Sequence, residues 1–226
     1  MQQPSGKPLV RSPGFTPSNY GPMTPPRVIL ASASLRRREL LGLLGISFDV
    51  IPAEIAEEPQ PDELPDKLVT RLAAEKAEVI AARHPEAVII SADTTVVLPG
   101  SANCPHRFLG KPADAAEARS MLSCLSGRTH SVFTGICVLF PAKSFRTVRA
   151  VQTLVKFADL QPETIENYIR TGEPLDKAGA YAVQGTAGLF VEHIHGSYSN
   201  VVGLPLAELA AELKQTGCWR FFPVGP

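Results

Sequence analysis

Apolar residues follow two patterns along this chain. Short continuous runs bounded by turn-forming residues are typical of buried strands. Such runs and other β-rich stretches predict strands at 27–31, 48–51, 87–92, 96–98, 131–140, 147–158 and 188–193. Apolar residues that recur every three to four positions predict helices at about 34–44, 62–84, 114–125, 162–170 and 205–213. We expect 96–98 to continue from 87–92 as a hairpin, and 131–140 to pair antiparallel with 147–158.

Helices and strands alternate without a strict strand–helix–strand order. This arrangement predicts an α/β domain, or an α+β one, built around a mixed sheet that helices flank. Residues 1–26 contain seven prolines and few apolar side chains, which predicts a disordered proline-rich extension. The folded domain is therefore expected at 27–216, followed by a C-terminal tail at 217–226.

Composition narrows the classes of function. The 22 basic residues balance the 22 acidic ones, so a broad basic surface for nucleic acid is not favoured. No apolar run approaches the ~18 residues of a membrane-spanning helix, and no membrane partner is expected. The four cysteines lie far apart in the sequence, which favours reduced thiols in a cytoplasmic protein over a zinc site.

Candidate chemistry begins at the first predicted strand-to-helix turn. Ser32 and Ser34 precede a helix that opens with Arg36 and Arg37. Free N–H groups at a helix start favour an anion, and hydroxyls and guanidinium groups donate well to phosphate. The alternative is a plain helix cap followed by a solvated basic face.

Acids and lysines elsewhere extend this picture. Asp93 follows an apolar run, where a carboxylate facing a cleft would bind magnesium or deprotonate water, with Glu57 as a second oxygen ligand. The alternative for Asp93 is a turn cap. Lys111 stands between Gly110 and Pro112, where a loop lysine would point at a phosphate or simply occupy a turn. Lys76 has acidic helical neighbours, and taken alone it indicates a solvated lysine.

A stretch rich in small residues, 176–185, would allow the backbone to approach a ligand closely. It contains Lys177 and ends with Gln184, whose amide carries both a donor and an acceptor suited to reading a base edge. The alternative is a glycine-rich crossover beside the core. No Walker A or GxGxxG string is present, which excludes those two nucleotide-binding folds.

Together these motifs resemble the Maf family of nucleoside triphosphate pyrophosphatases, in order and over most of the chain. The segments that carry the resemblance are LASASLRRRELL (30–41), RLAAEKA (71–77), SADTTVVL (91–98), GKPADAAEA (110–118), LSGRTHSVFTG (125–135), GEPLDKAGAYAVQG (172–185) and HGSYSNVVGLPL (195–206). Leu35 departs from the family's usual proline, and the stretch before Lys111 is longer than usual. The resemblance implies an elongated fold of the inosine triphosphatase type, with two lobes around a cleft and a homodimeric assembly.

The resemblance also implies roles for residues. It places Asp93 at the proton-acceptor position, with Lys76 and Lys111 as further catalytic groups, and Glu57 with Asp93 as ligands of a divalent metal (Mg²⁺, Mn²⁺ or Co²⁺). The positions linked to substrate choice are Arg36, Thr94 and Gln184. The remaining positions of the phosphate pocket are Ser32, Ser34, Arg37 and Lys177.

The implied reaction splits a nucleoside triphosphate between its α- and β-phosphates. Lys177 and Gln184 resemble the subgroup that acts on dTTP and UTP. Two alternatives remain open at this point: the same chemistry on 7-methyl-GTP or another modified nucleotide, and a non-catalytic regulator of cell division.

Overall fold

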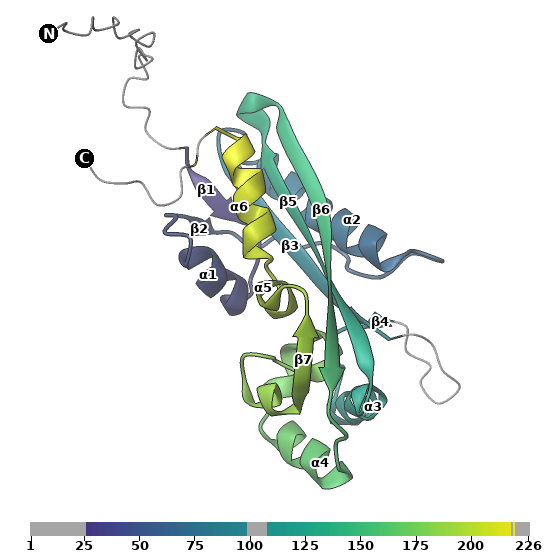
Figure 1. Ribbon diagram of the computed structural model, residues 1–226. Helices are drawn as coiled ribbons and strands as arrows, with labels where there is room; N and C mark the ends of the chain where they lie inside the picture. The colour runs from purple at the N-terminus through teal and green to yellow at the C-terminus, as the bar shows by residue number, and fades with distance from the viewer. Residues whose placement is uncertain (1–25, 99–107, 218, 220–226) are drawn as a thin grey trace, which may run out of the picture.

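A mixed, open sheet runs along the length of the molecule (Figure 1). The computed structural model describes residues 26–98, 108–217 and 219. The sheet has seven strands in the order β2-β1-β3-β5-β6-β7, and β4 also pairs with β3. The strands are β1 (Val28–Leu30), β2 (Asp49–Val50), β3 (Val88–Val97), β4 (Phe108–Leu109), β5 (Thr129–Phe140), β6 (Phe145–Phe157) and β7 (Val191–His195). β1 runs parallel to β2 and β3, and the other pairings are antiparallel, which confirms the predicted mixed sheet.

Helices cover the sheet and continue beyond its lower end in Figure 1. They are α1 (Leu35–Gly42), α2 (Pro65–Ala81), α3 (Ala115–Leu125), α4 (Pro162–Arg170), α5 (Tyr198–Val202) and α6 (Leu206–Gln215). Short 3₁₀ turns form η1 (Pro141–Lys143), η2 (Glu173–Asp176), η3 (Ala178–Ala180) and η4 (Thr186–Phe190). None of the helices in the described ranges is long and apolar enough to cross a membrane.

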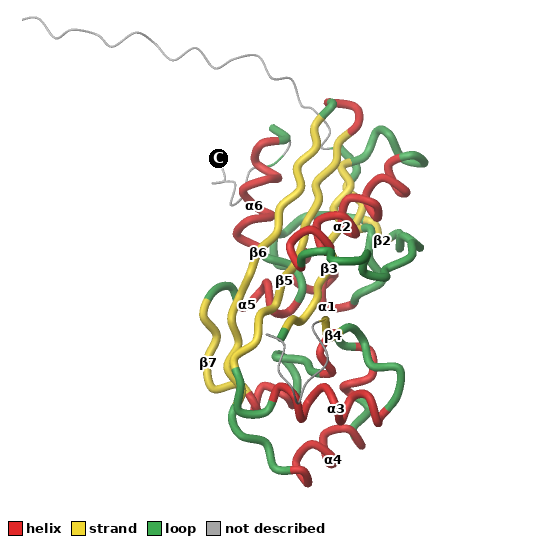
Figure 2. Tube along the Cα trace, turned by 90° about the vertical axis from the view of Figure 1, so that its right-hand side faces the viewer, coloured by secondary structure: helices red, strands yellow, loops and turns green. Residues whose placement is uncertain are grey.

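Three clusters of buried hydrophobic residues in the described chain mark out two lobes. In one lobe, α1 and α6 pack on one face of the sheet and α2 packs on the other, as the two views together show (Figures 1 and 2). In the other lobe, α3, α4 and the turns η2, η3 and η4 surround the far ends of the strands, with Phe157 fully buried. β3 and β5 contribute buried residues to both lobes. The predicted two-lobed fold is therefore confirmed.

β3 differs from the sequence prediction. We expected a strand that ends at Asp93 and a hairpin that continues at 96–98, but Val88–Val97 is one strand that pairs with β5 from Ile89 to Val97. The polar residues Asp93, Thr94 and Thr95 interrupted the apolar pattern, although Asp93 and Thr95 are buried. Similarly, the predicted strand at 188–193 begins only at Val191, because the residues before it form η4. Residues 1–25 of the predicted extension, and 99–107 in the long stretch before Lys111, lie outside the described residues.

One edge of β3 is covered only in part. β5 pairs with residues 89–97 along its other edge, whereas on this edge β1 pairs with residues 88–90 and β4 with residues 96–97. No strand in the described part of the chain covers the interval 91–95. Asp93 and Thr94 lie in the middle of that interval, between the two lobes.

Gly135 lets α2 lie against the sheet beside this interval. It pairs with Asp93 across β3 and β5, and a Cβ placed on it would lie 2.1 Å from the carbonyl oxygen of Val69 in α2. Such a contact is far inside van der Waals distance, and the obstacle is backbone. Glycine at this position therefore sets how closely α2 approaches Asp93.

We expect Gly135→Ala to lower the free energy of unfolding by about 3 kcal/mol, at the upper end of what overpacking costs, because α2 must move away from β5. Urea unfolding measures the change. Gly42→Ala is the matched control, since nothing lies within 4 Å of the Cβ it adds. Equal stabilities of the two variants would contradict the close approach as the reason for glycine.

Candidate functional site

A cleft opens between the two lobes beside the uncovered interval of β3. Its main cavity has a volume of about 680 Å³, and a smaller cavity of about 270 Å³ adjoins it. Both cavities are lined by Arg37, Glu57, Lys76, Thr94 and Lys111. The two cavities are thus parts of one site.

The structure brings the predicted site residues together in this cleft. Those that line the main cavity are Ser32, Ser34, Arg36, Arg37, Glu57, Lys76, Thr94, Lys111, Lys177 and Gln184. Asp93 lines the smaller cavity. Residues as far apart in the sequence as Ser32 and Gln184 therefore surround one space. The departure from the family pattern, Leu35, is 71% exposed at the start of α1 on the rim of the cleft.

Lys76 joins two carboxylates at the centre of the site. Its Nζ lies 2.6 Å from Asp93 Oδ1 and 2.6 Å from Glu57 Oε1. The side chains of Lys76 and Asp93 are 7% and 11% exposed, whereas that of Glu57 is 51% exposed. The interpretation of Lys76 as a solvated helical lysine is therefore wrong, and so is that of Asp93 as a turn cap, because Asp93 lies within a strand. Of the two Asp93 carboxylate oxygens, only Oδ1 accepts a hydrogen bond from a described residue.

α2 and β3 fix this centre from one face of the sheet. Successive side chains of a strand point to opposite faces, so Ser91 and Asp93 both face α2. Ser91 Oγ donates a hydrogen bond of 2.5 Å to the carbonyl oxygen of Ala73, one helical turn before Lys76. This bond ties α2 to β3 where the lysine must meet the aspartate.

The charge balance keeps Glu57 ionised. Burial alone would raise the pKa of its carboxyl, but the hydrogen bond and charge of Lys76, with the charges of Lys111 and Arg37, outweigh burial and lower that pKa. Glu57 is therefore a carboxylate at neutral pH.

On the opposite face, Arg37 connects α1 to β3 and to the turn after α5. Its Nε donates to the carbonyl oxygen of Gly203 at 2.8 Å, one terminal nitrogen donates to Thr94 Oγ1 at 3.0 Å, and the other to Ser32 Oγ at 3.3 Å. Burial lowers the pKa of this guanidinium, and the charges of Asp93 and Glu57 oppose that shift. Described residues thus accept from three of its five N–H groups, which leaves two for a ligand.

Ser34 caps α1, which was the plainer of the two interpretations of this motif. Its Oγ accepts a hydrogen bond from the backbone N–H of Arg37 at 3.4 Å. The neighbouring Arg36 lines the cavity, and burial lowers its pKa against the opposing charges of Asp176 and Glu173. The start of α1 therefore combines a structural cap with two cations aimed at the cleft.

Lys111 and Lys177 lie on two segments that are joined directly. The backbone N–H of Gly179 donates to the carbonyl oxygen of Gly110 at 3.0 Å. Gly179 has φ +70°, and a Cβ there would lie 2.9 Å from a methyl group of Val96. The Lys177 ammonium pairs with Asp176. The small residues of this stretch thus allow a tight turn that packs on β3 and brings both lysines to one wall.

Gln184 is exposed on a loop that Glu173 and Tyr168 hold in place, and the sequence analysis missed both of these residues. Glu173 accepts hydrogen bonds from the Tyr168 hydroxyl at 2.9 Å and from the backbone N–H of Thr186 at 3.1 Å. A Cβ on Gly185 would lie 2.4 Å from the Glu173 carboxylate, so the loop passes directly over it. Glu173 lies inside the quoted motif 172–185, but nothing in its spacing indicates that it would hold the loop.

The donor set suits a divalent metal that a nucleotide brings with it. In the described ranges, no group of three or more His, Cys, Asp or Glu side chains forms a complete cage. Glu57 and Asp93 instead converge on one point, the Lys76 ammonium. Magnesium typically binds through one or two carboxylates and substrate phosphates, and these two carboxylates fit that pattern.

The family model and the curated relatives that match this chain agree with one another. Residues 27–216 match the family model described as Maf-like protein. The dTTP/UTP pyrophosphatase of Syntrophus aciditrophicus is 47% identical over 195 residues, which is 86% of this chain and 92% of that protein. The dTTP/UTP pyrophosphatase of Anaeromyxobacter dehalogenans is 51% identical over 194 residues, or 85% and 95% of the two chains. The solved Staphylococcus aureus Ham1 protein aligns at a TM-score of 0.48 and 16% identity, over 84% of this chain and 99% of that one.

Proposed function

The chain belongs to the Maf family, and from this premise we propose that it is a nucleoside triphosphate pyrophosphatase acting on dTTP and UTP. The substrate pair is the one in the names of its curated relatives. The observation that carries the proposal is the buried Lys76–Asp93 pair in a cleft lined with cations. In the cell, this activity would remove unwanted nucleotides from the pool.

Phosphate binding is assigned to the cations of the cleft. These are Arg36, Arg37, Lys76, Lys111 and Lys177. A cavity of about 680 Å³ lies within the usual range of small-molecule sites. Cations held in fixed positions stabilise the negative charge that develops on the leaving pyrophosphate, and such electrostatic stabilisation is often the largest contribution to catalysis.

Asp93 is assigned the role of proton acceptor. Lys76 holds its Oδ1 at 2.6 Å, which orients the carboxylate and leaves Oδ2 for a water molecule. That water attacks the phosphorus of either the α- or the β-phosphate and transfers a proton to Asp93. The bond between the attacked phosphorus and the oxygen that bridges the two phosphates breaks. The products are a nucleoside monophosphate and pyrophosphate, whose oxygens together include the one from water.

A divalent metal (Mg²⁺, Mn²⁺ or Co²⁺) would be held by Glu57 and Asp93. When bound, it would neutralise charge on the phosphates and polarise the bond that breaks. The chain's own part is to hold both carboxylates close together, and Lys76 does this by contacting both of them.

Base selection is assigned to Gln184. An amide pairs with the carbonyl and N–H groups of uracil or thymine together, and a base that leaves those groups unpaired is rejected. We expect Gln184→Glu to change the preference for dTTP and UTP over CTP and ATP by about tenfold, because it replaces a donor by an acceptor. The measurement is kcat/KM for the four nucleotides, with a melting temperature for each variant.

Gln152→Glu is the control for this substitution, because Gln152 is an exposed residue of β6 that lines neither cavity. If Gln184→Glu lowers activity on all four nucleotides by one factor and leaves their ranking unchanged, Gln184 only supports the loop and has no part in selection.

A pyrophosphate-release assay over a panel of nucleotides tests the proposed function. We expect turnover of dTTP and UTP with Mg²⁺ or Mn²⁺, and much slower turnover of CTP, ATP and 7-methyl-GTP. A preference for 7-methyl-GTP would shift the substrate assignment within the same chemistry. No turnover of any nucleotide would overturn the proposal and favour the non-catalytic regulator.

Two further expectations accompany the proposed function. An enzyme that acts on nucleotide pools is expected in the cytoplasm, and the family leads us to expect a homodimer. Fractionation of cells and sedimentation of the purified protein test these expectations separately. Neither nucleic acid nor membrane is proposed as a partner.

A further inference from the structure

Glu57 is carried by a segment that has no regular structure of its own. Between β2 and α2 the described chain forms no helix or strand, and most of its residues are exposed. Yet Glu57 Oε1 lies 2.6 Å from Lys76 Nζ. Something outside the backbone pattern must therefore hold this segment, residues 52–64, against α2.

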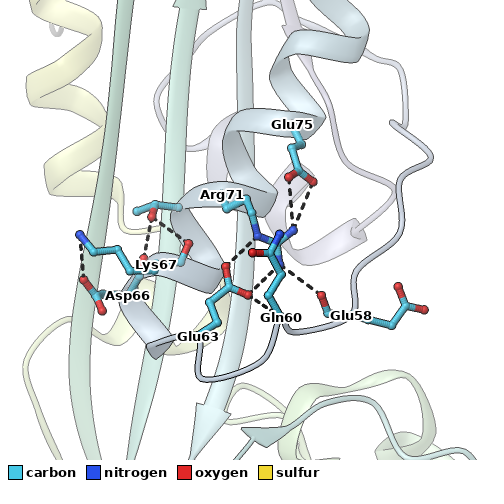
Figure 3. A network of polar contacts seen from close by, with 8 residues as sticks. Glu58, Gln60, Glu63, Asp66, Lys67, Arg71 and Glu75 are labelled. Carbon is cyan, nitrogen blue, oxygen red and sulfur yellow. Dashed lines mark hydrogen bonds and ion pairs between the residues drawn. The ribbon is translucent and has the colours of Figure 1, made fainter.

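Arg71 makes that connection (Figure 3). Its Nε donates to Glu63 Oε1 at 2.7 Å and one terminal nitrogen donates to Glu63 Oε2 at 2.8 Å, which is a bidentate pair. The nitrogen that contacts Oε2 also donates to the carbonyl oxygen of Glu58 at 3.2 Å. Glu58 is the residue next to Glu57, so Arg71 fixes the segment both at its end and directly beside the site.

The other terminal nitrogen of Arg71 anchors the guanidinium to its own helix. It donates to Glu75 at 3.2 Å, one turn further along α2 and next to Lys76. The side chains of Arg71 and Glu63 are 22% and 8% exposed. A paired, largely buried guanidinium has little freedom, so it acts as a rigid strut between α2 and the segment.

The segment is also closed on itself through Glu63. Glu63 Oε2 accepts from the backbone N–H of Gln60 at 2.9 Å, and the N–H of Glu63 donates to the carbonyl oxygen of Gln60 at 3.1 Å. Asp62 between them has φ 56°, a left-handed conformation that aspartate tolerates better than most residues. The turn thus directs the Glu63 carboxylate back toward Arg71.

Arg71 and Glu63 both stay charged over the pH range in which the enzyme would work. The hydrogen bond from Arg71 outweighs burial and lowers the pKa of Glu63, and the hydrogen bond to Glu63 raises the pKa of Arg71. The pair is therefore ionised at neutral pH.

We propose that Arg71 is a positioning residue, which places Glu57 at Lys76 by clamping the segment 52–64 through Glu63 and the Glu58 carbonyl. Arg71 lines neither cavity of the cleft, so it acts through Glu57 and not on the substrate itself. The catalytic part of this inference rests on the proposed function, whereas the clamp itself does not.

A double-mutant cycle tests the catalytic part. Arg71→Gln is expected to lower kcat/KM for dTTP by about tenfold in the native background and by less than about twofold in the Glu57→Gln background. Arg71→Lys, which keeps the charge but cannot form the bidentate pair, should fall between Arg71→Gln and the native chain. An equal loss in both backgrounds, or no loss in either, would overturn the role through Glu57.

Arg146→Gln is the matched control for this cycle. It removes a bridge of 2.7 Å between an arginine and Glu78, which also lies on α2, but both partners of that bridge are exposed and neither touches the segment. We expect its kcat/KM to stay within twofold of the native value.

Hydrogen exchange tests the clamp independently of any measurement of pyrophosphatase activity. Arg71→Gln should speed exchange at the amides of Gln60 and Glu63 by at least tenfold, while the amide of Leu68 in α2, bonded to the Leu64 carbonyl at 2.9 Å, changes little. Unchanged exchange at Gln60 and Glu63, or an equal rise at all three amides, overturns the clamp. If these amides respond as expected but the native protein releases no pyrophosphate, the clamp stands and the proposed function fails.

Discussion

Asp93→Asn is expected to lower kcat for dTTP by about 10²–10⁴-fold while the protein stays folded, because this is the range that a general base contributes. Asparagine has the shape of aspartate, and its carbonyl oxygen still accepts the hydrogen bond that Lys76 donates at 2.6 Å. What it loses is the negative charge that would accept a proton from water and bind a metal. Steady-state kinetics with dTTP, and a melting temperature for each protein, measure the two consequences separately.

Asp114→Asn is the matched control for this prediction. Asp114 caps α3 by accepting the backbone N–H of Glu117 at 2.8 Å, and asparagine serves as well at that position. Its kcat and melting temperature should both stay near the native values. A kcat for Asp93→Asn within about threefold of the native value would remove Asp93 from the mechanism.

Lys76→Met is expected to lower both activity and stability. The substitution leaves Asp93, 11% exposed, without its cationic partner, and removes the group that holds two carboxylates together. Breaking a buried ion pair from one side typically costs 3–5 kcal/mol, and since Glu57 is half exposed we expect about 2–4 kcal/mol of the free energy of unfolding. The kcat should fall by at least about 10²-fold, since phosphate stabilisation and orientation of Asp93 are lost together.

Urea unfolding of two further variants tests the reason for that loss. Lys67→Met, on the same helix with its side chain 71% exposed, should unfold within about 0.5 kcal/mol of the native chain. The double variant Lys76→Met, Asp93→Asn should be more stable than Lys76→Met alone, because it no longer buries an unpaired charge. If the double variant is the less stable of the two, the unpaired Asp93 carboxylate is not the cause.

The local pattern of apolar residues was enough to predict the helices and strands in which that pattern repeats without interruption. The helix at 162–170 and the antiparallel pair of β5 and β6 lie where the sequence places them. It was insufficient for β3, because Asp93 is a charged residue inside a mostly buried strand, and its bond to Lys76 of α2 makes that burial possible. α5 was missed for a related reason: five residues give no period, and the helix depends on the Ser197 cap.

The candidate site could likewise be predicted from the sequence only in part. Motifs identified the residues of the cleft, since serine, arginine, lysine and aspartate each have a chemistry that a triphosphate requires. They did not show which groups meet. Glu75 and Glu78 are the sequence neighbours of Lys76, yet its partners are Glu57 and Asp93, because α2 lies against Gly135. Long-range bonds such as those of Glu173 leave no local trace in the sequence.

Identification of the products of dTTP turnover tests the central claim most directly. Native protein, dTTP and Mg²⁺ are incubated together, and nucleotides and phosphates are separated by ion-exchange chromatography, with Asp93→Asn as the blank. The account predicts dTMP and pyrophosphate in equal amounts from the start, with neither dTDP nor inorganic phosphate as an early product. Early dTDP and inorganic phosphate, or no turnover of dTTP by the native protein, would contradict it.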